Sequence, residues 1–92
     1  MKYPVMTPNT RAFFDSEYAD LFREWERLAE LRESALGSGG GDLADTLYLK
    51  IRVCRGKIGE LDSILSGAFH LERRRHDAYS NIVWDYVPME EE

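Results

Sequence analysis

The stretch from Asp42 to Arg75 constrains the fold more than any other, because it carries apolar residues on two sides at helical spacing. One stripe steps mostly by four and three residues and comprises Leu43, Leu47, Ile51, Cys54, Ile58, Leu61, Leu65 and Ala68. A second stripe, roughly 120° away at about 100° per residue, comprises Leu49, Val53, Gly56, Ile64, Gly67 and Leu71. A helix with two apolar sides needs two sets of neighbours. A second helix of the same chain covers one stripe, so we predict that the other mediates self-association.

Residues 8–36 show the pattern of the helix that covers the first stripe. Thr7 and Pro8 suit the N-cap and the first helical position. The glycine-rich residues 37–41 predict a reversal of direction, after which Asp42 begins the next helix. We therefore predict an all-α fold, an antiparallel two-helix hairpin that dimerises into a four-helix bundle. It forms a single domain over residues 1–92, with helices at about 8–36 and 42–75 joined by the loop 37–41.

The two termini are predicted to be extended. The basic run Arg73–Arg75 suits the C-terminal end of the second helix, where positive charge is stabilised by the helix dipole. Residues 79–92 form a tail in which apolar residues alternate around Trp84 and Tyr86. A hairpin brings residues 2–6 and 82–87 to the same end, so we expect them to pair as a small ribbon.

Size and cysteine content also favour self-association. A chain of 92 residues buries roughly two-thirds of its unfolded surface, which leaves an isolated hairpin marginally stable. A disulfide framework within the chain is excluded because Cys54 is the only cysteine, and its place in the first stripe indicates a small core residue. A lone thiol suits a reducing compartment. No apolar run approaches the roughly 20 residues of a membrane span, so we expect a soluble, cytoplasmic protein that binds no membrane.

Catalytic chemistry is not expected. No serine lies in a nucleophile elbow, and Cys54 and His70 fall on different sides of the predicted helix. The carboxylate pairs Glu26/Glu30 and Glu17/Asp20 have a spacing that can hold a hard cation. A di-metal site in a bundle also requires a Glu-x-x-His motif, which the chain lacks. We interpret these pairs as a solvated helix face and expect no catalytic residue, no metal site and no cofactor.

The formal net charge of −5 and the acidic side of the first helix favour a protein-interaction role. We predict a non-enzymatic module that binds a larger protein or complex, by analogy with small acidic inhibitors and assembly factors of phages and plasmids. The predicted partner-binding residues are Glu17, Asp20, Glu24, Glu26, Glu30, Glu33, Trp84 and Tyr86. The two aromatic residues have an alternative role, in which they close the open end of the core near Phe13 and Phe14.

An arginine strip on the second helix supports an alternative function. Arg52, Arg55, His70 and Arg73 fall on one side at helical spacing, so they can bind the phosphates of a nucleotide or nucleic acid. The net negative charge favours a structural alternative, in which these arginines pair with glutamates of the first helix. Arg32 stands out on the apolar side of the first helix, and we predict that it meets Asp42 or Asp45.

Overall fold

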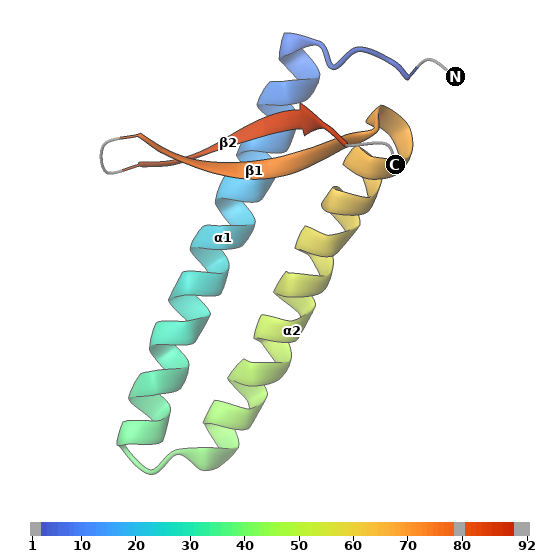
Figure 1. Cartoon of the computed structure of the whole chain (residues 1–92). Coiled ribbons are helices and arrows are strands. Elements are labelled where there is room, and N and C mark those ends of the chain that lie inside the picture. The colour runs from blue at the N-terminus through green and yellow to red at the C-terminus, as the bar shows by residue number, and fades with distance from the viewer. Residues whose placement is uncertain (1–2, 79–80, 90–92) are drawn as a thin grey trace. The chain divides into compact units, whose positions relative to one another are not determined.

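The computed structural model describes residues 3–78 and 81–89 and contains two long helices and one two-stranded sheet (Figure 1). The order is α1 (Pro8–Gly37), α2 (Gly41–Ile64), the π-helical segment η1 (Leu65–Phe69), β1 (Leu71–Ala78) and β2 (Asn81–Pro88). The chain divides into two compact units. We call Ser16–Gly59 the helical unit, and Met1–Asp15 with Glu60–Glu92 the mixed unit. Both long helices contribute residues to both units, and the one-domain organisation stays a prediction.

The helical unit is the antiparallel hairpin that the sequence predicts (Figure 1). Its core comprises Leu28, Ala35, Ala44, Leu47 and Ile51, with Trp25 packed against it. The buried residues of α2 in this unit are Ala44, Leu47, Ile51, Cys54 and Ile58, which include four members of the first stripe. The first stripe therefore faces α1 from Leu47 to Ile58, as expected, but its first member Leu43 is 57% exposed and Ala44 is buried there instead.

Glycine is favoured at two positions of the turn between α1 and α2. Gly39 has φ +78°, a left-handed conformation that side chains with a Cβ rarely adopt. The N–H of Gly40 donates to the carbonyl of Ala35 at 2.7 Å, and a Cβ on Gly40 would lie 3.3 Å from that oxygen. At the other end of α1, the N–H of Thr10 donates to Oγ1 of Thr7 at 3.2 Å, which confirms the predicted N-cap.

The second helix ends well before Arg75, and the fold is therefore not all-α. Regular α-helix stops at Ile64, η1 follows, and His70 adopts a left-handed conformation with φ 55° before β1 begins. The arginines predicted at the end of the helix lie in β1 instead, where each is paired in register with a residue of β2. Arg73 lies opposite Tyr86, Arg74 opposite Asp85, and Arg75 opposite Trp84. The guanidinium of Arg73 lies 4.2 Å from the ring centre of Trp84 on the neighbouring strand, whereas Arg74 pairs with Glu72 of its own strand at 2.9 Å. Cross-strand contacts with aromatic residues stabilise a sheet, and this pairing competes with continuation of the helix.

The extended character expected for residues 82–87 is present, but their partner is not the one predicted. They lie in β2, which pairs antiparallel with β1. Residues 3–6 form no strand. The predicted pairing of residues 82–87 with residues 2–6 is therefore wrong over the residues that the structure describes. The sequence-adjacent strand closes a much shorter loop than the distant N-terminus does, which lowers the entropic cost of pairing.

The mixed unit has an aromatic core. Phe14 and Leu65 are buried. The ring of Phe14 meets that of Phe69 edge-on at 6.2 Å and lies 6.3 Å from that of Tyr86. The ring of His70 stacks on that of Tyr3, with 4.6 Å between the ring centres. The backbone carbonyl of His70 accepts a hydrogen bond from the N–H of Met89 at 3.0 Å. The strand pair thus packs on residues from the start of α1, within one unit.

Neither long helix, over the residues described, combines the length and the apolar character needed to cross a membrane.

Candidate interaction surfaces

A groove runs along one side of the helical unit. It has a volume of about 390 Å³ and is lined by Leu21, Glu24 and Leu28 from α1 and by Thr46, Leu49, Lys50, Val53, Cys54 and Lys57 from α2. The α1 residues are spaced by three and four, so they form one stripe of that helix. Glu17 precedes Leu21 on this stripe by four residues, and Leu31 follows Leu28 by three. We call this surface the groove face.

Large apolar side chains are left uncovered on the groove face. The exposed fraction is 59% for Leu49, 61% for Val53 and 43% for Leu31. Single exposed apolar residues are ordinary on protein surfaces, but a group of them beside a groove is typical of an interaction site. The groove face is therefore a candidate interaction surface of this hairpin.

Only part of the predicted self-association stripe belongs to this face. Leu49 and Val53 line the groove, whereas Gly56 lines a recess with Tyr48 and Arg52. Ile64 ends α2, Gly67 lies in η1, and Leu71 begins β1. The stripe is not continuous because helical geometry, on which its spacing depends, does not extend to Leu71.

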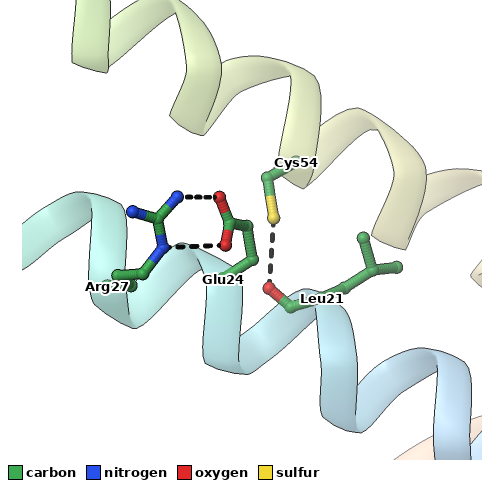
Figure 2. A network of polar contacts seen from close by, with 4 residues as sticks. All are labelled: Leu21, Glu24, Arg27 and Cys54. Carbon is green, nitrogen blue, oxygen red and sulfur yellow. Dashed lines mark hydrogen bonds and ion pairs between the residues drawn. The ribbon is translucent and has the colours of Figure 1, made fainter.

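The single thiol of the chain, that of Cys54, belongs to the lining of the groove. Cys54 is buried, and its S–H donates to the carbonyl oxygen of Leu21 at 3.1 Å (Figure 2). Burial raises the pKa of the Cys54 thiol, and the negative charge of Glu24 adds to this effect. A buried, protonated thiol is a poor nucleophile, so this position acts as core.

The carboxylate at the edge of the groove is paired within its own helix. Glu24 and Arg27 form a two-point ion pair with distances of 2.6 and 3.0 Å (Figure 2). The hydrogen bond from Arg27 lowers the pKa of Glu24, and the charge of Lys50 lowers it further. The same hydrogen bond raises the pKa of Arg27. Lys50 and Lys57 form no ion pair with a described carboxylate.

A second surface of the helical unit combines arginines with aromatic rings. A recess of about 390 Å³ is lined by Tyr48, Arg52, Arg55 and Gly56. The guanidinium of Arg55 lies 5.6 Å from the ring centre of Trp25, and that of Arg32 lies 5.5 Å from that of Tyr48. We call Trp25, Arg32, Tyr48, Arg52 and Arg55 the arginine–aromatic face. None of its arginines forms an ion pair with a carboxylate in the described residues.

The other two members of the predicted arginine strip lie in the mixed unit and have partners there. Nε and a terminal nitrogen of Arg73 bond to the two carboxylate oxygens of Asp62 at 3.0 and 3.1 Å. The same guanidinium lies 4.2 Å from the ring centre of Trp84. Because β1 replaces the end of the predicted helix, His70 and Arg73 do not continue the line of Arg52 and Arg55.

The predicted acidic surface divides into paired and unpaired carboxylates. Asp20 lies 3.5 Å from Arg23, and Glu24 bonds to Arg27. Glu17 is half-buried beside the groove face. Glu26, Glu30 and Glu33 are exposed, lie at i, i+4 and i+7 of α1, and form no ion pair among the described residues. These three form the acidic row, and their role in partner binding stays a prediction.

Trp84 and Tyr86 pack within the mixed unit and are half-buried. The hydroxyl of Tyr86 donates to Oδ1 of Asp15 at 2.7 Å, and its ring lies 5.8 Å from the guanidinium of Arg11. These contacts, with Phe14 nearby, match the alternative in which the tail aromatics close a core. A binding role for either residue would require the unit to give up these contacts.

Sequence reasoning missed the parts that the two helices build together. Arg32 was expected to meet Asp42 or Asp45, but it lies over Tyr48 and forms no ion pair with either in the described residues. The sequence suggested no role for Lys50, and for Lys57 only that of a candidate ion-pair partner of Glu60 in the subunit interface. The position of both lysines could have been found from spacing. Lys50 lies three residues before Val53 and Lys57 four residues after it, which places all three on one side of α2. Within the described ranges, no three His, Cys, Asp or Glu residues are placed to hold a metal ion.

Comparison with protein-family models, with curated proteins and with solved structures finds no match to this chain.

Proposed function

We propose that this chain is a non-enzymatic protein-interaction module that works as a homodimer, in which two groove faces pack together as a four-helix bundle. The observation that supports it is the uncovered apolar surface of the groove face, with Leu49 and Val53 about 60% exposed. Packing two hairpins face to face removes these side chains from water, at roughly 25 cal/mol per Å² of apolar surface. A chain this short gains the second core layer that it cannot build alone.

The charges on the groove face favour one relative orientation of the two copies. Its α1 stripe carries Glu17 and Glu24, and its α2 side carries Lys50 and Lys57. An arrangement with α1 of one copy against α2 of the other brings glutamates next to lysines twice, by symmetry. With α2 against α2, lysines face lysines and glutamates face glutamates. Opposite charges at an interface rim favour the first arrangement.

Charge reversal tests this dimer. In sedimentation or light-scattering measurements, we expect the wild type at twice the 10.7 kDa of one chain. In K50E/K57E both helices of the groove face carry acidic residues, and in E17K/E24K both carry basic residues. Two copies of the same variant therefore repel each other, and each variant alone should be monomeric. An equimolar mixture should recover the dimer, because each contact then joins opposite charges.

The acidic row supplies the matched control. E26K/E30K changes charge on the same helix but outside the groove face, so it should dimerise like the wild type. The arrangement is contradicted when K50E/K57E alone dimerises as tightly as the wild type. A monomeric wild type at high concentration contradicts the dimer itself. Helical circular dichroism confirms that each variant is folded.

A larger protein is the proposed partner of the dimer, with the acidic row as the contact surface. Like charges at i, i+4 on a helix destabilise it by a few tenths of a kcal/mol, so Glu26 and Glu30 carry a cost that a basic partner would offset. The row suits the basic groove of a nucleic-acid-binding protein, as an inhibitor of phage or plasmid type would require. A lone buried thiol is compatible with the reducing cytoplasm.

Capture from the native host tests this part separately. Wild-type protein on a resin should retain a specific partner that E26K/E30K does not retain, while both remain dimeric. Capture that persists in E26K/E30K contradicts the role of the acidic row, and it leaves the dimer proposal to its own test.

A further inference from the structure

We propose that the arginine–aromatic face is a binding site for phosphoryl groups. Its recess is lined by Arg52 and Arg55, which lie one turn apart on α2, about 4.5 Å along the axis at 1.5 Å per residue. Two guanidinium groups at this spacing can donate to one phosphoryl group or to two neighbouring ones. Planar donors in a fixed fork match phosphate oxygens well.

The aromatic rings position the arginines. The ring of Trp25 contacts both the guanidinium of Arg55, at 5.6 Å, and the ring of Phe22, at 5.9 Å. Tyr48 holds the guanidinium of Arg32 in the same way, at 5.5 Å. A guanidinium over an aromatic face keeps its N–H groups directed along its own plane, free for an anion at the edge. Trp25 therefore serves to hold Arg55 rather than to stack a base.

None of the arginines of this face forms an ion pair with a carboxylate among the described residues, which is informative because the chain is acidic overall. With 17 acidic and 12 basic residues, most arginines have a carboxylate available, and five described ion pairs use them. Arg32, Arg52 and Arg55 take part in none of these. Arg32 and Arg55 contact aromatic rings, and Arg52 lines the recess together with Tyr48, so the three arginines form a local positive site on a negative molecule.

The recess favours a small phosphate ligand over an acidic protein surface. Its volume of about 390 Å³ is sufficient for a small ligand. A phosphoryl group supplies three oxygens and up to two charges to one point, where side-chain carboxylates supply two oxygens and one charge each. Inorganic pyrophosphate, a nucleoside diphosphate and a nucleic-acid strand share this chemistry.

Titration calorimetry at about 50 mM salt, where exposed charges are weakly screened, tests the site with three probes: pyrophosphate, ADP and a single-stranded oligonucleotide. Each of R52A and R55A should weaken binding about tenfold, the loss of one charge-assisted hydrogen-bonded contact. R52A/R55A should remove it. R52K keeps the charge but not the fork, so it should bind more weakly than the wild type and more tightly than R52A. R23A removes an arginine paired with Asp20 and should bind like the wild type.

The probes identify the source of the phosphoryl group. Equal affinity for pyrophosphate and ADP supports a site for the phosphates alone, and tighter binding of ADP supports a nucleotide. Binding of the oligonucleotide alone, with a steep salt dependence, supports a nucleic-acid backbone. The proposal is overturned when none of the three binds below about 1 mM, or when R52A/R55A binds as the wild type does. It is equally overturned when only a glutamate-rich peptide binds. Dimerisation by the groove face is measured independently and does not affect this result.

Discussion

At the scale of single residues, the burial of Cys54 has a consequence for stability at high pH. Its thiol pKa is raised in the folded chain, so the folded state holds this proton more tightly than the unfolded state does. The stabilisation is fully present below the unfolded pKa of about 8.5 and is lost as pH rises through the folded pKa. Cys54→Ser keeps a donor for the Leu21 carbonyl but does not titrate.

We therefore expect the unfolding free energy of the wild type to fall, relative to that of C54S, as pH rises above about 8.5. Denaturant unfolding of both proteins from pH 7 to 10.5 measures the difference and cancels the lysines and tyrosines that they share. A thiol reagent at pH 8 should also react far more slowly with folded than with unfolded protein. A constant difference between the two proteins across this pH range contradicts the prediction.

The role of Cys54 as core could be predicted from the sequence, because it depends only on spacing within one helix. Other residue-level features could not. Arg32 needs the cross-helix position of Tyr48, which spacing along one helix does not give. His70 takes a left-handed conformation, uncommon for residues other than glycine, at the junction of η1 and β1. No local pattern marks that junction.

At the scale of elements, α2 contains two glycines, Gly56 and Gly59, that weaken the helix without allowing a close contact with another described part of the chain. A Cβ on Gly56 or Gly59 would meet nothing within 4 Å. Each glycine weakens a helix interior by up to about 1 kcal/mol relative to alanine. We expect Gly59→Ala to raise the unfolding free energy by about 0.5–1 kcal/mol, measured by denaturant titration.

Gly56 provides the comparison, because it borders the recess of the arginine–aromatic face. Gly56→Ala should stabilise the protein by a similar amount, since the recess leaves room for a methyl group. If Gly56 instead lets another helix approach closely, as its place in the predicted stripe implied, G56A would weaken dimerisation. Equal stabilisation by both variants, with an unchanged dimer, would locate the interface away from Gly56.

The two long helices and their turn were predictable because hydrophobic period, N-cap and glycine run agree. The strands were only half predictable. Alternation around Trp84 marked β2, whereas β1 contains Arg73–Arg75, which equally suits a helix end. The deciding interaction is non-local: the guanidinium of Arg73 in β1 lies 4.2 Å from the ring centre of Trp84 in β2. Reading residues 72–75 against 84–87 for complementary pairs would have found the sheet.

At the scale of the whole molecule, the dimer predicts a specific dependence of stability on concentration. Association with a second folded copy stabilises the folded state by mass action, so the melting temperature should rise with protein concentration. A monomer has a melting temperature independent of concentration. Differential scanning calorimetry over about a hundredfold concentration range separates the two cases, and K50E/K57E should abolish the dependence.

Two leucines with nearly equal exposure make this test specific to the groove face. Leu49 is 59% exposed and lines the groove, whereas Leu36 is 52% exposed and lies outside it. In a monomer, Leu→Ala at either exposed position should change the unfolding free energy by no more than about 0.5 kcal/mol. In the bundle Leu49 is buried, and its truncation should cost about 2 kcal/mol or more per chain, while L36A stays near zero. Equal effects of L49A and L36A would mean that water, and not a second copy, covers the groove face.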